Sequence, residues 1–277
     1  MRGDMPELPE VETVMRQILS SNILKRKILL GQVHNPSTVG GDVEGFTKGV
    51  IDSQILAITR RGKYLVFHLS SGFFILAHLR MSGHFYVRDS FVKKDAHEHI
   101  GLSFEGGSWL IFHDPRKFGR VLLVEDPNLY LNHLGIEPLS ENYTWGKFKE
   151  IFKTHRNIKT VLLDQTCIAG LGNIYVDETL FACGIHPLRR AIDLNHQERR
   201  KLFEEIPHQL LQGIKFQGTS LGKGVSNFHA VNGQSGKYQE RLQVYQKANR
   251  PCPNCQRPIT KIRVGQRGTH VCAHCQN

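Results

Sequence analysis

Short runs of apolar or alternating residues, separated by glycine and other turn formers, follow one another through the first half of the chain. Such a density of short strands is typical of a β-sandwich or barrel. Before them, Val11, Val14 and Ile18 recur at helical spacing, which predicts a helix over residues 9–20 with one face in the core. The predicted strands cover residues 28–33, 51–60, 64–69, 73–79, 99–104, 109–113 and 121–124.

The pattern changes in the second half of the chain. A Gly-Ile-Glu-Pro stretch within residues 132–143 ends the strand pattern, and apolar positions then follow a helical period from Trp145 to about Gln212. Residues 217–237 are rich in glycine, and this composition predicts a mobile loop. We therefore expect an α+β fold with two domains: an N-terminal β-sandwich with a flanking helix, then a helical domain. The predicted boundaries are 6–135 for the sandwich, 136–217 for the helices, 218–240 for the loop and 241–277 for the last segment.

Composition and charge point to a polyanionic partner. The chain has 277 residues, of which 40% are hydrophobic and 22% charged, as in ordinary globular proteins. Lys and Arg outnumber Asp and Glu by 36 to 25, and residues 237–277 hold eight basic residues against the single acid Glu240. This excess favours nucleic acid. No long apolar run, signal peptide or lipidation motif occurs in the sequence, so we expect a cytoplasmic protein without membrane contact.

Four cysteines near the C-terminus form two Cys-x-x-Cys pairs separated by sixteen residues. This spacing predicts one tetrahedral Zn²⁺, with residues 258–269 forming a short β-hairpin between the pairs. Four sulfur ligands leave no position for water, so the metal would be structural. Disulfides are the alternative, which a cytosolic location disfavours. The expected ligands are Cys252, Cys255, Cys272 and Cys275, whereas Cys167 and Cys183 lack such partners and are expected in the core.

Pro6 decides the chemistry of the N-terminus. If translation starts at Met5 and that residue is removed, the chain begins with a secondary amine whose pKa should lie near 7.7 to 8.0, so that a nucleophilic fraction exists at neutral pH. Within a longer chain the same nitrogen is an amide. We expect residues 1–5 to be an extension that reflects a mis-assigned start. The alternative reading of this segment is only structural, with Pro9 at the first helical position and acidic residues in the first turn.

A glycine-rich turn precedes a helical segment at residues 168–178. The backbone N–H groups of Gly172 and Asn173 could bind a phosphate there, because a helix N-terminus has unpaired donors and a favourable dipole. Asn173 is also a good N-cap, and the two readings are compatible.

The run Pro6-Glu-Leu-Pro-Glu-Val-Glu-Thr13 resembles the N-terminus of the formamidopyrimidine-DNA glycosylase family. The segment 168–178 resembles the helix-two-turn-helix of that family, and the resemblance continues to the last cysteine. It implies a monomeric, bifunctional glycosylase and lyase that removes oxidised purines, such as 8-oxoguanine and formamidopyrimidines, from double-stranded DNA. Such an enzyme must flip the damaged nucleotide out of the duplex.

The resemblance also implies the catalytic residues. Pro6 would attack C1′ and displace the base, and β- and δ-elimination would then cut the strand. Glu7 would act as acid and base at the sugar, and Glu10 would position or protonate the site. Lys63, which without the resemblance reads as a solvated turn lysine, would contact phosphate and carry protons. Arg267 would contact phosphate and assist strand cleavage.

Further residues would hold the DNA. Met81 and Phe118 would fill the gap left by the flipped base while Arg116 pairs with the orphaned base, although Met and Phe at strand ends are commonly buried. Ser220 and the loop that follows would close over the extruded base. The other implied DNA contacts are His97, Arg156, Lys159, Gly172 and Asn173.

Three alternatives remain at the level of sequence. An endonuclease VIII-type enzyme for oxidised pyrimidines shares these motifs, but typically has glycine where Leu8 stands. A non-catalytic zinc DNA-binding protein would result if residues 1–5 are retained. RNA binding would show no preference for damaged duplex.

Overall fold

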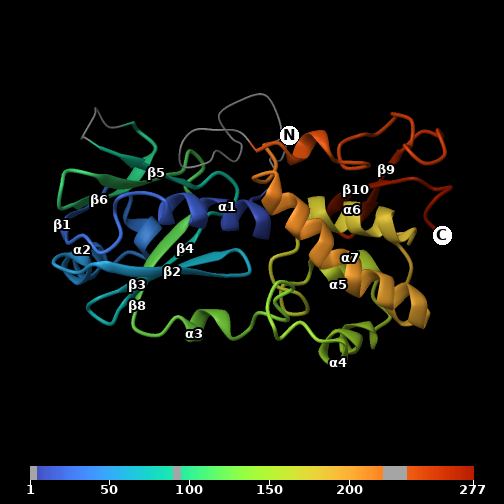
Figure 1. The fold of residues 1–277 in the computed structure, drawn as a ribbon, viewed down its shortest axis with the longest axis horizontal. Helices are drawn as coiled ribbons and strands as arrows, with labels where there is room; N and C mark the ends of the chain where they lie inside the picture. Colours follow the sequence, from blue (N-terminus) through green and yellow to red (C-terminus); the bar gives the residue numbers. More distant parts are fainter. Residues whose placement is uncertain (1–4, 90–94, 221–235) are drawn as a thin grey trace. The chain divides into compact units, whose positions relative to one another are not determined.

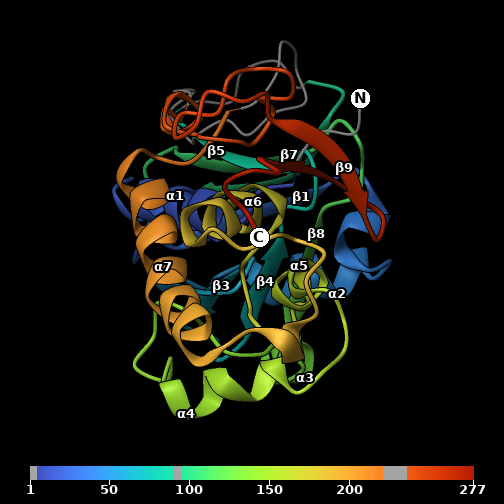
Figure 2. The ribbon, with the colours of Figure 1, turned by 90° about the vertical axis from the view of Figure 1, so that its right-hand side faces the viewer.

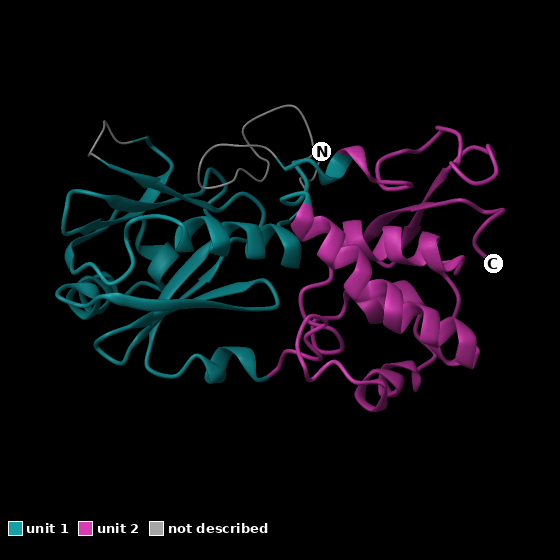
Figure 3. Cartoon of the chain, viewed as in Figure 1, with its two compact units in different colours: residues 1–132, 216–239 teal, residues 133–215, 240–277 magenta. Residues whose placement is uncertain are grey.

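The computed structural model describes residues 5–89, 95–220 and 236–277. The chain forms two compact units, residues 1–132 with 216–239 and residues 133–215 with 240–277 (Figure 3). The α+β fold with a sandwich, a helical part and a hairpin at the end is confirmed, and the segment 216–239 belongs to the first unit although it follows the helices in sequence. Residues 1–4 of the predicted extension and residues 221–235 of the predicted loop lie outside the described residues.

The first unit contains two four-stranded antiparallel sheets, which form the two layers of a β-sandwich (Figure 1). The strand order in one sheet is β1-β6-β7-β5, formed by Ile28–Val33, Glu98–Phe104, Trp109–His113 and His84–Arg88. The order in the other is β2-β3-β4-β8, formed by Ile55–Arg61, Tyr64–Leu69, Phe74–His78 and Arg120–Val124.

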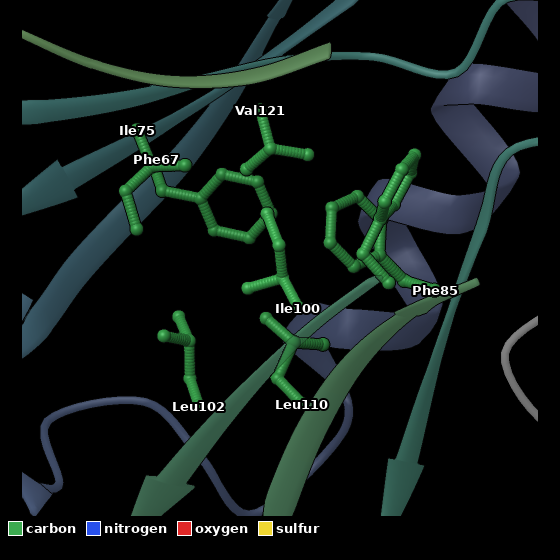
Figure 4. A pocket seen from close by; sticks show the side chains of 8 residues that line it. Phe67, Ile75, Phe85, Ile100, Leu102, Leu110 and Val121 are labelled. Atoms are coloured by element: carbon green, nitrogen blue, oxygen red, sulfur yellow. The ribbon is translucent and has the colours of Figure 1, made fainter. Parts of the chain in front are cut away.

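Apolar side chains of both sheets meet in the sandwich core. Phe67 and Ile75 come from one sheet and Phe85 and Ile100 from the other, and their side chains surround a small apolar cavity (Figure 4). The cavity has room for one water molecule at most, and its lining is apolar, so it has no groups to hold one. It is therefore a packing defect rather than a ligand site.

Helices pack against the strands of the sandwich. Helix α1 (Leu8–Leu19) contacts strands of both sheets, and Val11, Val14 and Ile18 are fully buried, which confirms the predicted stripe. The helix begins one residue earlier than predicted, so Pro9 occupies its second position. The remaining helices of this unit are η1 (Pro36–Val39), α2 (Val43–Val50) and α3 (Asn128–Leu131).

The second unit is built from several short helices, two longer ones and one hairpin (Figure 2). Helix α6 (Asn173–Cys183) is buried on almost every side and packs against α7 (His196–Lys215). The predicted helical run is thus divided into several helices: α4 (Trp145–Phe148), η2 (Lys149–Phe152), α5 (Ile158–Leu163), α6, η3 (Ala191–Asp193) and α7. After η4 (Tyr238–Glu240), strands β9 (Thr260–Val264) and β10 (Arg267–Val271) form the hairpin.

Among the described residues, none of the helices combines the length and apolarity needed to cross a bilayer.

Candidate active site and nucleic-acid interface

The N-terminus of α1 gathers three of the predicted catalytic residues in a buried position. Pro6 is buried, and Glu7 and Glu10 are exposed by only 2% and 1%. The backbone N–H of Glu7 donates to Glu10 Oε2 at 2.9 Å, which satisfies one of the donors that a helix start leaves unpaired. The Glu7 side chain in turn accepts from the backbone N–H of Glu10, so this capping box fixes both carboxylates close to Pro6 in sequence.

Glu10 also ties residues 218–219 to this helix. Its Oε1 accepts from the backbone N–H of Thr219 at 2.8 Å and from the Thr219 hydroxyl at 3.1 Å. Gly218 has a φ of +76°, a conformation that glycine adopts without strain, and a Cβ there would lie 2.9 Å from Glu10 Cγ. A glycine is thus required for this close approach, and Glu10 acts as the anchor of the segment.

Lys63 lies in the turn between β2 and β3, directly after Gly62, and is only 7% exposed. Arg60 secures this turn to α1, because its Nε donates to Glu12 Oε2 at 2.8 Å. Burial would raise the pKa of Glu12, but the hydrogen bonds and charges of Arg60 and Arg16 outweigh it and lower that pKa. The alternative reading of Lys63 as a solvated turn lysine is wrong, since Lys63 is buried in the same unit as Pro6.

His78 lies at the end of β4 near Lys63. Burial, together with the charges of Arg80 and Lys63, lowers the pKa of His78 to about 3. Its Nδ1 accepts from the backbone N–H of Arg80 at 3.0 Å, so the proton of the neutral ring is on Nε2. The imidazole is consequently neutral at physiological pH.

Asp114 joins the two loops predicted to fill the gap in the duplex. Its fully buried carboxylate accepts hydrogen bonds from the hydroxyl of Ser82 and from the backbone N–H groups of Arg116 (3.2 Å) and Gly119 (2.6 Å). Asp114 was not among the predicted site residues. Its role as the organiser of both loops could have been suspected because an Asp before Pro and Gly often accepts from nearby amides.

The side chains carried by these loops differ in exposure. Phe118 is 54% exposed, although it is large and apolar, and Met81 is half-buried with Arg116 Nη1 3.6 Å from its sulfur. The core alternative is therefore wrong for Phe118. Met81 and Arg116 are brought together.

His97 and Ser220 occupy two further positions in the first unit. His97 is half-buried, with its ring edge against His113 at a centroid distance of 5.6 Å. The backbone N–H of Ser220 donates to Gln239 Oε1 at 3.1 Å, and its hydroxyl accepts from Gly236 N–H at 2.9 Å. Ser220 and Gly236 are thus joined directly by a hydrogen bond.

In the second unit the start of α6 differs from the prediction. Gly172 is the N-cap, and Asn173 is the first residue of the helix, so the prediction of Asn173 as N-cap is wrong. The Asn173 side chain instead donates from Nδ2 to the carbonyl oxygen of Gly268 at 3.0 Å and to the Tyr245 hydroxyl at 3.3 Å. The long-range contact to β10 takes the amide away from local capping.

The structure corrects the prediction for Lys159. Its side chain is fully buried, with Nζ 2.5 Å from Asp177 Oδ1, and so is not placed for direct contact with a phosphate. Arg156 is 48% exposed and forms an ion pair with Asp164 at 2.8 Å. Both residues have the same charge and lie close in sequence, and only tertiary packing separates them.

The four predicted zinc ligands converge at the base of the hairpin. Their sulfur atoms all lie within 4.8 Å of one another, and two separations are 3.9 Å (Cys252 to Cys275) and 3.5 Å (Cys255 to Cys272). Sulfurs around a tetrahedral zinc with bonds of about 2.3 Å would be roughly 3.8 Å apart, whereas a disulfide bond measures about 2.05 Å. The residues therefore fit one Zn²⁺, and all six cysteines are free. Arg267, at the start of β10, is exposed.

Comparison with known families gives a match over most of the chain. Residues 5–121 match the formamidopyrimidine-DNA glycosylase N-terminal domain, and residues 134–224 match the formamidopyrimidine-DNA glycosylase H2TH domain. Residues 250–277 match a zinc finger found in FPG and IleRS.

Relatives and solved structures cover the full length. The formamidopyrimidine-DNA glycosylases of Protochlamydia amoebophila and Pelotomaculum thermopropionicum are 40% and 41% identical, over 98% of this chain and 99% of theirs. The Lactococcus lactis Fpg in complex with DNA containing an abasic site superposes with a TM-score of 0.89 at 37% identity, covering 98% of this chain and 99% of that one. The MutM (Fpg) protein of Thermus thermophilus gives 0.87 at 36% identity, covering 98% of each chain.

Proposed function

The chain belongs to the formamidopyrimidine-DNA glycosylase family, and we propose that the nitrogen of Pro6 is the nucleophile of its reaction. The protein is a DNA glycosylase and lyase of base-excision repair with one structural zinc. Its substrates are oxidised purines, 8-oxoguanine and formamidopyrimidines, in double-stranded DNA. Lactococcus lactis Fpg complexes with DNA containing an abasic site or Fapy-dG support this substrate class.

The observation that carries the proposal is the position of Pro6 directly before two buried, fixed carboxylates. In a chain that begins at Pro6, the neutral secondary amine attacks C1′, and the bond from C1′ to the base breaks as the nitrogen bond forms. The base leaves with its electron pair and takes up a proton, and Glu7 transfers protons at the sugar. Loss of the remaining nitrogen proton, with opening of the sugar ring, gives an iminium ion. Glu10, whose two oxygens accept from Glu7 and Thr219, positions this end of the helix.

Strand cleavage follows from the iminium ion. It withdraws electrons from the sugar, so a proton at C2′ becomes acidic and the 3′ phosphate leaves by β-elimination. A second elimination releases the 5′ phosphate. Lys63 carries protons and contacts the phosphate of the damaged nucleotide, and Arg267 contacts phosphate and assists the second elimination.

The remaining residues hold the DNA around the flipped nucleotide. The exposure of Phe118 and the contact between Met81 and Arg116 support their insertion into the duplex. Ser220 would hold the lesion-capping segment. The other proposed DNA contacts are His97, Arg156, Gly172 and Asn173.

The zinc site has a structural role in this proposal. The four cysteines would hold one Zn²⁺, which fixes the base of the hairpin carrying Arg267 and supplies no reacting group. We propose that the protein acts as a monomer in the cytoplasm. Sedimentation at micromolar concentration, with and without DNA, tests the monomer.

Borohydride trapping tests the proposed nucleophile. Two proteins are compared on a duplex with one 8-oxoguanine: a chain whose N-terminus is verified as Pro6 by intact mass, and a chain verified to retain residues 1–5. Only the first should give a covalent adduct, because only it has a free amine on Pro6. Equal trapping by both chains contradicts the proposal. Faster cleavage of thymine glycol than of 8-oxoguanine would instead assign the enzyme to oxidised pyrimidines.

A further inference from the structure

Lys159 and Asp177 form an ion pair with no solvent exposure in the second unit. Lys159 comes from α5 and Asp177 from α6, and both side chains are 0% exposed. Removing two charges from water is costly, and an apolar pair of similar volume is often as stable or more stable. Stability alone is therefore a weak explanation for this pair.

Both members of the pair contact the backbone of β10. Lys159 Nζ donates to the carbonyl oxygen of Gly268 at 3.4 Å. Asp177 Oδ2 accepts from the backbone N–H of His270 at 2.9 Å and lies 3.4 Å from His270 Nδ1. These groups belong to the residues one and three positions after Arg267, and both views of the ribbon show β10 beside α6 (Figures 1 and 2).

The next residue of α6 holds a second segment. The buried carboxylate of Glu178 accepts from the backbone N–H groups of Gln243 (2.7 Å), Val244 (3.0 Å) and Tyr245 (2.8 Å). Two consecutive carboxylates on one helix thus anchor two separate segments of the C-terminal region. Tyr245 and His270 complete the connection, since their rings lie 5.0 Å apart.

The same carbonyl links the hairpin to the start of α6. Gly268 accepts from Lys159 and also from Asn173 Nδ2 at 3.0 Å. Gly268 is the residue next to Arg267. Its carbonyl oxygen therefore connects β10 both to Lys159 and to Asn173, a proposed phosphate contact.

We propose that Lys159, Asp177 and Glu178 are positioning residues for Arg267. Lys159 and Asp177 fix the backbone that carries Arg267, so that the guanidinium is held in register with the DNA backbone during strand cleavage. Glu178 supports β10 through Tyr245, whose ring packs against His270. This inference rests on the proposed function, in which Arg267 assists the second elimination. The zinc would fix the base of the hairpin, and Asp177 fixes its second strand, β10.

The test uses the full-length, zinc-loaded enzyme on a duplex with one abasic site under single-turnover conditions. In the double variant Lys159→Met with Asp177→Leu, both charges and the contacts to β10 are removed together, so no unpaired charge is left buried. We expect the ratio of δ- to β-elimination to fall about ten- to a hundredfold, because displacement of a catalytic group by about 1 Å has effects of this size. The borohydride-trapped adduct and the zinc content should be unchanged.

Two further variants separate positioning from stability. Lys159→Met with Asp177→Asn keeps an acceptor for the His270 amide and should recover part of the δ-elimination. Leu202→Ala, at a fully buried site in α7, is the control for lost stability and should leave the product ratio unaltered.

A double-mutant cycle gives the decisive result. In an Arg267→Ala background, Lys159→Met with Asp177→Leu should cause no further loss of δ-elimination. A further loss as large as in the native background, or a native product ratio in the variant, would overturn the inference. Failure of the unmodified enzyme to trap abasic DNA would instead contradict the proposed function, and the two failures are therefore distinguishable.

Discussion

Buried carboxylates hold the backbone of this protein at several points where function is proposed. Glu10 anchors Thr219, Asp114 anchors the amides of the loop before β8, and Asp177 and Glu178 anchor the C-terminal region. A hydrogen bond to an ionised acceptor is stronger than one between neutral groups, and losing a buried partner costs about 1 to 3 kcal/mol. Glu10, Asp114 and Glu178 therefore fix loop segments, and Asp177 fixes strand β10.

His78 should remain neutral well into the acid range. The folded pKa is about 3 and the unfolded pKa about 6.5, so the unfolded chain binds more protons between these values. The contribution of His78 to stability should be complete above about pH 6.5 and should decrease as the pH falls toward 3. NMR titration of the ring measures this directly. A midpoint near 6.5 in the folded protein would contradict the burial described for His78.

Asp114→Asn should loosen both gap-filling loops. The substitution replaces one acceptor oxygen by a donor facing backbone N–H groups, so we expect a loss of about 1 to 3 kcal/mol in the free energy of unfolding. Affinity for lesion-containing duplex should fall about tenfold, because Met81 and Phe118 would no longer be held. Denaturation and DNA titration measure the two effects. The exposed Asp126, which accepts from Asn128 N–H, provides the control Asp126→Asn. Equal behaviour of the two variants would refute the role given to Asp114.

Elements with strong apolar patterns were predictable, whereas weakly patterned ones were not. Strands β1, β3 and β7 have the bounds that alternation indicated. Helix α2 was missed because its eight residues include Gly45 and Gly49, which lower helix propensity, and it is stabilised by Asp42 capping Gly45 N–H. Strand β5 was missed because its alternation consists of His and Arg against Phe and Val.

Site residues that belong to a local motif were predictable, whereas those whose partners are distant in sequence were not. The cysteine spacing predicted a convergent site because both pairs are local motifs, and the four sulfurs do converge. Lys159 and Asn173 were misread because their partners, Asp177 and Gly268, are distant in sequence or belong to another element. Local sequence reveals charge and propensity but not which cation is buried.

Removing zinc should unfold the C-terminal hairpin alone. The segment is too small to bury an adequate core, and structural zinc contributes about 10 to 16 kcal/mol in small fingers at neutral pH. With a strong chelator, amide exchange should become rapid across residues 250–277, while the β-sandwich of the first unit keeps its protection. Hydrogen exchange with mass spectrometry measures both regions. Persisting protection of β9 and β10 without metal would contradict a zinc-dependent fold.

The whole molecule carries a formal net charge of +11, and this excess is concentrated toward the C-terminus. Charge of this kind attracts any duplex and does not distinguish lesions. In the proposed function, lesions are selected by the loops that carry Met81, Arg116 and Phe118 and by the nucleotide-flipping step. Pro6 supplies the chemistry.

Salt should therefore weaken binding steeply. If about four phosphates are neutralised, the affinity for duplex DNA should fall about a hundredfold between about 50 and 200 mM monovalent salt. Fluorescence anisotropy over that range measures the slope. Arg156→Ala should reduce the slope of log affinity against log salt concentration by about one. Lys159→Met should leave this slope unchanged, because the buried Lys159 makes no phosphate contact in this account. An affinity independent of salt would contradict the proposed basic contacts.

The central claim is that Pro6 bonds covalently to the sugar, and locating the adduct on the chain tests it most directly. The enzyme is reduced with borohydride on lesion DNA, digested, and sequenced by mass spectrometry. We predict a nucleotide remnant on the amino-terminal peptide, attached to the nitrogen of Pro6 with no residue before it. A remnant on the Lys63 side chain, or on a peptide that still contains Met5, would contradict the account.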